Sequence, residues 1–135
     1  MYVIDGHNLI SCLPGVSLSE IDDEEQLIEL LQAFSRRKRK RVEVFFDQAP
    51  PGYAGERRAG LVRAHFVSAE SKADDAILRG LQRMGRGEAR NAVVVSSDHQ
   101  VQANARALGA SVVASEVFAR ELELASMNGA SQAGS

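Results

Sequence analysis

The chain has 135 residues, 44% of them hydrophobic and 25% charged, which is ordinary for one globular domain with its own core. Its formal net charge of −2 favours no class of partner. The single cysteine excludes an internal disulfide, and the absence of tryptophan disfavours recognition by rows of stacked aromatic rings. The sequence predicts neither a signal peptide nor a membrane span, so a cytoplasmic protein in a reducing compartment is expected.

Strands and helices are predicted to alternate along the chain. Apolar, β-branched runs predict strands at 1–5, 42–47, 61–67, 92–96 and 110–113. Helical periodicity and capping residues predict helices at 22–40, 71–84, 97–109 and 115–124. This order is typical of a three-layer α/β/α sandwich with a mostly parallel central sheet. Residues 1–125 are predicted to form the domain, and the small, polar residues 126–135 a disordered tail.

Three local features accompany these elements. Ser19 and Asp22 have the spacing of a capping box before the first helix. Residues 48–55 are rich in Pro and Gly and predict a loop, which is either a plain connector or a mobile loop beside a site. Residues 85–87 (GRG) predict the end of the second helix.

Aspartates follow three of the predicted strands. Asp5, Asp47 and Asp98 stand at strand ends, and Asp74 and Asp75 open a helix that follows a strand. Right-handed crossovers place the carboxyl ends of parallel strands along one edge, where open α/β sheets bind their ligands. Carboxylates gathered there repel one another, and Mg²⁺ or Mn²⁺ relieves that conflict because both prefer oxygen ligands. The pattern therefore fits metal-assisted hydrolysis of a phosphodiester.

Each acid also has a purely structural interpretation. Asp74 could complete a capping box, Asp98 could stabilise the first turn of its helix, Asp5 could start an Asx turn, and Asp47 could keep a strand end soluble. Capping accounts for any one of them, but it is a poor explanation for all of them together. We therefore expect a metal site formed by several of these carboxylates.

Other polar residues near the acids have two interpretations. Asn8 could orient an aspartate or contact the scissile phosphate, or it could belong to a turn. The pair Ser96–Ser97 could bond the metal ligands or a phosphate, although Ser97 also has the spacing of a capping box. Lys72 could hold phosphate or face solvent. His7 and His99 have no zinc partner at ligand spacing and are predicted to be exposed turn residues.

Basic residues are concentrated at 36–41 (RRKRKR), where a helix is predicted to end and a strand to begin. This run is either a solvated face that suits the helix dipole or a contact to a nucleic-acid backbone. An acidic pocket repels RNA, so a nuclease needs cations beside it. The candidate RNA contacts are Arg36, Arg37, Lys38, Arg39, Arg57, Arg58 and Lys72.

Four short motifs resemble, in order and spacing, those of NYN domains. They are 3–8 (VIDGHN), 44–47 (VFFD), 72–77 (KADDAI) and 95–98 (VSSD). Within NYN domains the chain is most similar to the YacP-like group, in the PIN-like nuclease superfamily, and the resemblance extends from Met1 to about Leu124. It departs from the family at His7, where Tyr is frequent, and after Ile77, where an acid often follows.

The resemblance implies a PIN-like fold and a metal-dependent endoribonuclease, and some members act on ribosome-associated messenger RNA. It implies Asp5, Asp74 and Asp98 as the catalytic metal ligands. The supporting residues would be Asn8, Asp47, Asp75 and Ser97, and Asp75 falls at a variable position.

Two further functions compete with the nuclease. A non-catalytic RNA- or ribosome-binding module would use the same fold and the basic run. A phospho-acceptor domain of the receiver type also gathers acids at strand ends, but it requires a lysine after the last strand, where this chain has Ala114 and Ser115.

Overall fold

The described part of the chain, residues 1–13 and 23–133 of a computed structural model, forms six strands and five helices. The strands are β1 (Tyr2–Asp5), β2 (Val42–Ala49), β3 (Gly55–Ala59), β4 (Val62–Ser68), β5 (Val93–Val95) and β6 (Ser111–Val113). The helices are α1 (Gly6–Ile10), α2 (Asp23–Lys38), α3 (Ala73–Ala89), α4 (His99–Ala107) and α5 (Ser115–Ala133). None of the described helices is both long and apolar enough to cross a membrane.

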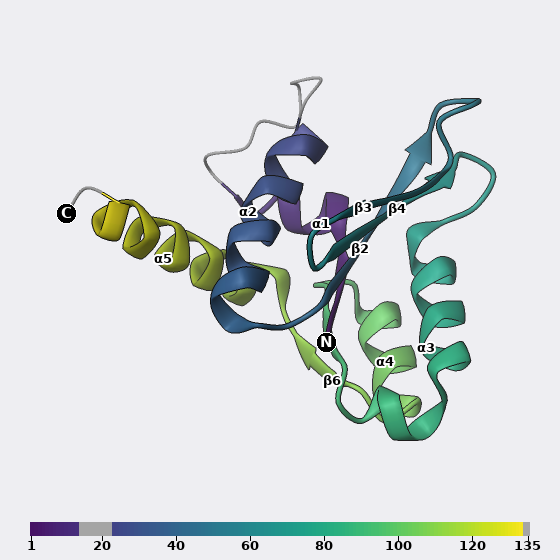
Figure 1. Cartoon of the computed structure of the whole chain (residues 1–135). Coiled ribbons are helices and arrows are strands. Elements are labelled where there is room, and N and C mark those ends of the chain that lie inside the picture. Colours follow the sequence, from purple (N-terminus) through teal and green to yellow (C-terminus); the bar gives the residue numbers. More distant parts are fainter. Residues whose placement is uncertain (14–22, 134–135) are drawn as a thin grey trace.

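A single sheet with the strand order β3-β4-β2-β1-β5-β6 forms the middle layer. The pairs β1–β2, β1–β5, β2–β4 and β5–β6 are parallel, and β3–β4 is antiparallel. Figure 1 shows α1, α2 and α5 on one side of the sheet and α3 and α4 on the other. The predicted three-layer α/β/α sandwich is confirmed.

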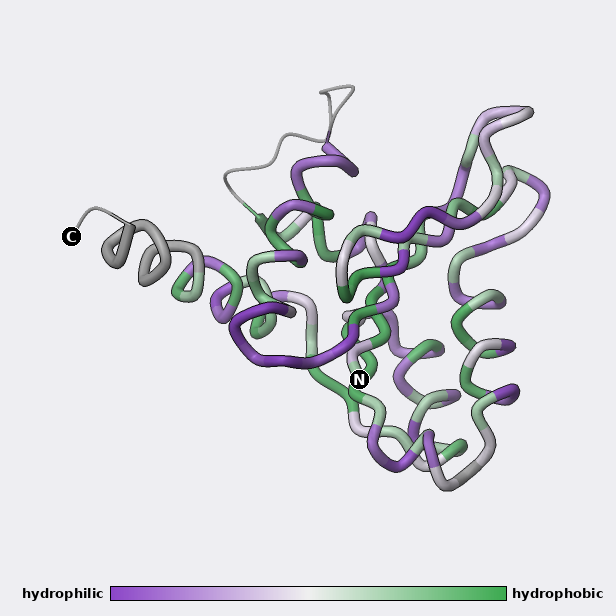
Figure 2. Tube along the Cα trace, in the orientation of Figure 1, coloured by the Kyte–Doolittle hydropathy of each residue, from purple (hydrophilic) through white to green (hydrophobic). Residues whose placement is uncertain are grey.

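Two apolar layers bury the faces of the sheet. On one side Phe34 of α2 and Phe118 of α5 pack edge to face, with ring centroids 5.1 Å apart, and both contact Tyr2 of β1. On the other side Ile77 and Leu81 of α3 pack against the strands. Figure 2 shows the central strands as mainly hydrophobic and the connection between α2 and β2 as strongly hydrophilic. The apolar residues that recur with helical periodicity in the sequence are the ones that the helices bury in these two layers.

Two short elements differ from the sequence-based expectations. The helix α1 follows β1 directly, although no helix is predicted before residue 22. The strand β3 follows the predicted loop and forms a hairpin with β4, and Gly60 at φ 61° makes the turn between them. β3 has no apolar alternation because it is an exposed edge strand, held by its backbone bonds and protected by charge.

Three helix ends also differ. α2 ends at Lys38 because Arg39 adopts the left-handed conformation (φ 55°), and the N–H of Lys40 then bonds to the carbonyl of Ser35. α3 is interrupted at Gly85, whose φ of 75° and ψ of 170° are not helical, as the sequence predicts, but a further helical segment then continues to Ala89. α5 continues to Ala133, into the segment predicted to be disordered, since extending an existing helix costs far less than starting one. The predicted Ser19–Asp22 capping box lies outside the described residues.

Gly6 allows α1 to begin directly above β2. A Cβ atom at this position would lie 2.5 Å from two ring atoms of Phe46 and 2.9 Å from the carbonyl oxygen of Phe45. Backbone atoms cannot yield as a flexible side chain would, so we expect Gly6→Ala to lower the free energy of unfolding by about 3 kcal/mol. Urea denaturation measures this loss.

Gly87→Ala is the matched control for this prediction. Position 87 lies in α3, and the space that an alanine methyl group would occupy there is open, so alanine should leave the stability equal or slightly higher. Equal stability of the Gly6→Ala protein and the unmodified chain would contradict the steric argument.

Candidate functional site

Three predicted acids act on one half-buried aspartate, Asp5, at the carboxyl edge of the sheet. Asp5 ends β1, and burial is the main cause that raises its pKa from 3.8 to about 6. A hydrogen bond from Ser96 opposes this rise, whereas the charges of Asp47, Asp98 and Asp74 add to it. The charges of the other two predicted metal ligands and of Asp47 therefore act on Asp5. Asp75 is exposed and is not among the charges that act on Asp5.

Asp5 stands at the N-cap position of α1, but its carboxylate does not cap that helix. Its Oδ2 instead accepts a hydrogen bond from the Ser96 hydroxyl at 3.1 Å. The same hydroxyl oxygen accepts a bond from the backbone N–H of Asp98, also at 3.1 Å, and Ser96 is fully buried. The Asx-turn interpretation of Asp5 is thus not supported, and Ser96 links two of the candidate ligands.

Asp98 and Asp74 each use one oxygen for local structure. Oδ1 of Asp98 accepts from the N–H groups of Gln100 and Val101, at 2.8 and 3.0 Å, and so caps α4. The capping box predicted for Ser97 is therefore wrong, because Asp98 takes the capping position. Oδ1 of Asp74 accepts from the N–H of Asp75 at 3.0 Å. These bonds fix the two side chains by one oxygen each, and no hydrogen bond in the described residues uses the other.

Asn8 and Ser97 connect three segments behind the acids. Oδ1 of Asn8 accepts from the N–H of Ser97 at 2.9 Å and from the hydroxyl of Ser115 at 2.5 Å. The Ser97 hydroxyl accepts from the N–H of Ser115 and donates to Glu116, at 3.0 and 2.8 Å. Asn8 and Ser97 thus hold the site loops together. Glu116 is a further acid that we did not predict, although it opens a helix after a strand as Asp74 does.

His7 is not the exposed turn residue that the sequence predicts. It is half-buried in α1, with Nδ1 2.7 Å from Asp47 and Nε2 2.8 Å from Glu24. Burial alone would lower the pKa of His7, but the bonds to Asp47 and Glu24 outweigh it, so the pKa lies above the usual value. The error arises because α1 turns this residue beneath the first turn of α2. No pattern in the sequence indicates the pairing with Glu24.

A cavity of about 840 Å³ opens next to this histidine. Arg57 of β3 lies in its wall and pairs with Glu25, with Nη2 2.7 Å from the carboxylate and the guanidinium 5.8 Å above the centre of the Phe66 ring. The bond to Glu25 raises the pKa of Arg57. Arg57, a predicted RNA contact, is therefore already paired with Glu25. The main lining residues are His7, Asp23, Glu24, Glu25, Asp47, Tyr53, Arg57 and Phe66.

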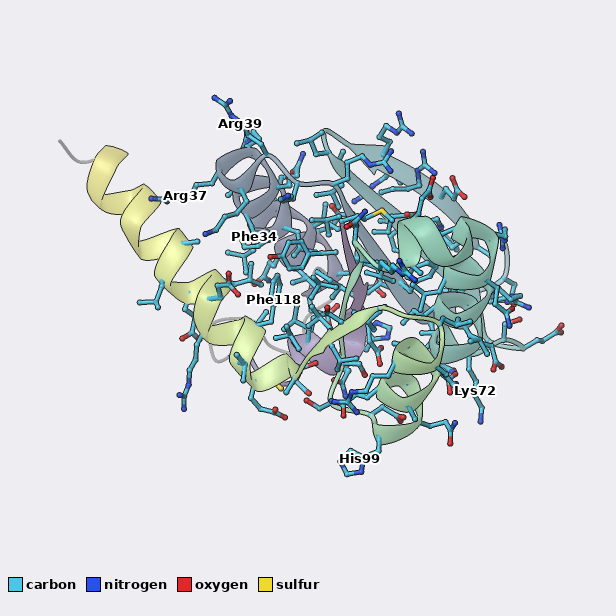
Figure 3. The ribbon with its side chains drawn as sticks, turned by 90° about the horizontal axis from the view of Figure 1, so that it is seen from below. Phe34, Arg37, Arg39, Lys72, His99 and Phe118 are labelled. Carbon is cyan, nitrogen blue, oxygen red and sulfur yellow. The ribbon has the colours of Figure 1, made fainter. Side chains whose placement is uncertain are left out.

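The other predicted RNA contacts are spread over the molecule. The basic run 36–41 immediately precedes β2, so it lies at the amino edge of the strands, opposite the acids. Figure 3 shows Arg37 and Arg39 beside α2 and α5, away from Lys72 and His99. Arg37 donates to the carbonyl of Ala125 at 2.8 Å, and Lys72 is exposed at the start of α3. RNA contact by these residues stays a prediction.

The donor chemistry at the acidic edge suits a hard divalent cation. The carboxylates of Asp5, Asp74 and Asp98 supply only oxygen atoms, and repulsion from the other two charges helps to raise the pKa of Asp5. In the described ranges, however, no three His, Cys, Asp or Glu side chains are gathered closely enough to hold a metal ion. The residues therefore fit a metal in type and charge, and binding would require their side chains to move closer together.

Comparisons with known proteins agree on one family. Residues 2–134 match the profile of the YacP-like NYN domain. The crystal structure of Rae1 (YacP) from Bacillus subtilis is similar, with a TM-score of 0.80 and 20% identity over 98% of this chain and 79% of that one. Its W164L mutant gives a TM-score of 0.72 at 20% identity, over 94% and 76%. At this identity the likeness shows a shared fold. No curated protein matches significantly.

Proposed function

Because the chain belongs to the YacP-like NYN domain family, we propose that it is a metal-dependent endoribonuclease that hydrolyses RNA phosphodiester bonds. The observation that carries this proposal is the environment of Asp5, where the charges of Asp47, Asp74 and Asp98 act on one half-buried carboxylate. Such a concentration of negative charge at a ligand-binding edge costs stability and is typical of a site that binds a cation.

Asp5, Asp74 and Asp98 would hold Mg²⁺ or Mn²⁺. When bound, the ion would stabilise charge on a phosphoryl oxygen and acidify a water molecule. Ser96 keeps one oxygen of Asp5 in a defined direction, and the Asn8–Ser97 contact fixes the loop that carries Asp98. His7 holds Asp47 by a bond of 2.7 Å. The substrate we propose is RNA, and family resemblance favours messenger RNA on the ribosome.

A non-catalytic RNA- or ribosome-binding module is the second candidate. In the described part of the chain, no three His, Cys, Asp or Glu side chains lie close enough together to hold a metal ion, and this favours the module. The exposed run 36–41 would then be the main contact. Such a module binds RNA with an affinity that falls steeply with salt, and it leaves the RNA intact at every metal concentration.

Cleavage of a labelled single-stranded RNA tests the enzyme against the module. We expect cleavage to stop in EDTA and to return with Mg²⁺ or Mn²⁺. Metal binding requires ionised Asp5, whose pKa in the free protein is about 6, so protons compete with the metal at acidic pH. At subsaturating metal the rate should therefore fall about tenfold from pH 7 to pH 5. Metal-independent cleavage, or RNA that stays intact at all metal concentrations, would contradict the proposal.

A further inference from the structure

A second cavity, of about 440 Å³, lies between α3 and the strands β2, β3 and β4. We refer to it as the α3 groove. Gly80 of α3 approaches Phe45 of β2 on one side of it, whereas β4 and β3 extend beyond the helix and leave part of their surface uncovered. The acidic edge and the groove share α3, since Asp74 lies in the first turn of the helix and the groove follows its later turns.

Three arginines line the α3 groove. Arg79 and Arg83 lie one helical turn apart on α3 and are exposed, and Arg63 faces them from β4. Within the described residues none of the three forms a salt bridge or hydrogen bond. The charges of Arg79 and Arg83 are therefore available to an anionic ligand, whereas the charge of Arg63 also acts on Glu43 and helps to lower its pKa.

Two of the three acids that line the groove, Glu43 and Glu56, are engaged by one histidine, and the third, Glu88, is exposed. His65 lies 2.8 Å from Glu43 and 3.5 Å from Glu56, and the bond from His65 is the main reason that the pKa of Glu43 is lowered. The His65 ring also stacks on Phe45, with centroids 4.4 Å apart and planes 8° from parallel. The groove thus combines unpaired arginines with the half-buried, flat ring of His65, and cationic and flat side chains are the two features that hold single-stranded nucleic acid.

We propose that the α3 groove binds the RNA strand on one side of the bond that is cut, with Arg63, Arg79 and Arg83 contacting its phosphates. The path of the strand in this proposal rests on the proposed function, which places the cleaved bond at the acidic edge. At 1.5 Å per residue, Arg79 and Arg83 lie roughly 7 and 14 Å along the helix from Asp74. A strand cut at the acidic edge would pass these arginines on leaving it.

Two other surfaces are less suitable for this strand. The 840 Å³ cavity is lined by five acids, and its arginine is paired with Glu25, so it repels phosphate. The run 36–41 lies at the amino edge of the sheet, away from the acids. The α3 groove combines unpaired positive charge with continuity to the acidic edge.

Fluorescence anisotropy of a short fluorescein-labelled oligoribonucleotide in EDTA, over a range of salt concentrations, tests the groove. We expect Arg79→Ala/Arg83→Ala to weaken binding about tenfold and to reduce the salt slope by about 1.4. The matched control is Arg106→Ala/Arg120→Ala, which removes the same charge from exposed positions of α4 and α5 and should change affinity by less than about twofold. Arg79→Lys/Arg83→Lys should retain most of the affinity.

Three results would overturn the proposal. They are unchanged affinity in the Arg79/Arg83 variant, a larger loss in the Arg106/Arg120 control, and no binding by the unmodified protein. Arg63→Ala gives a second, independent variant on β4 and should also weaken binding. Cleavage with unchanged affinity in all groove variants would reject the groove and retain the nuclease. Weakened binding by the groove variants, together with no cleavage by the unmodified protein, would retain the groove and reject the nuclease.

Discussion

Asp74→Asn should lower the rate of RNA cleavage about 1000-fold, whereas Asp75→Asn should change it by less than about twofold. The loss corresponds to about 4 kcal/mol of transition-state stabilisation, which is in the range of a removed metal ligand. Asparagine retains an oxygen that can accept the hydrogen bond from the N–H of residue 75, so the start of α3 should be preserved. Only the charge that faces Asp5 is lost.

The neighbouring substitution makes this test specific. Asp75 is exposed and does not contribute to the raised pKa of Asp5. Both substitutions remove one negative charge from the same helical turn, so a general effect on RNA affinity or on the helix dipole would be similar in both. Single-turnover cleavage rates with Mg²⁺ or Mn²⁺ measure the difference. Equal activity of the two variants would exclude Asp74 as a metal ligand.

Asp5→Asn should abolish cleavage to a similar extent and at the same time stabilise the metal-free protein. The pKa of this carboxyl rises from 3.8 to about 6 on folding, so the folded chain holds the ionised form at a cost. A shift of this size corresponds to about 3 kcal/mol at pH above 6. Asparagine carries no charge and can still accept a hydrogen bond from Ser96, so it removes this cost.

The pH dependence of this gain has a defined sign. Below pH 3.8 the carboxyl is protonated in both folded and unfolded chains, and the variant should gain almost nothing. The advantage should grow as the pH rises through the interval from 3.8 to about 6 and then stay constant. Urea unfolding at pH 4, 5, 6 and 7 measures it. Lower stability of Asp5→Asn at pH 7 would show that the charged form is favoured and would remove the main support for a cation site.

The sequence by itself determined the alternation of strands and helices, the parallel sheet and the edge at which its acids gather. The reason is that these features depend on local patterns: apolar runs of strand length, helical periodicity and an aspartate at each of three strand ends. Handedness of the crossovers then brings Asp5, Asp74 and Asp98 to the same edge. The match to the YacP-like NYN domain over residues 2–134 confirms the family that these motifs indicate.

Only the tertiary structure decided which polar side chains contact one another. The edge strand β3 has no apolar pattern to reveal it, and the pairing of Arg57 with Glu25 depends on that strand. The contact between Asn8 and Ser115 joins residues 107 positions apart. Such bonds depend on side-chain directions after packing, and no spacing rule in the sequence encodes them. For the same physical reason, the sequence does not predict the α3 groove, because its arginines come together only when α3 packs beside the β3–β4 hairpin.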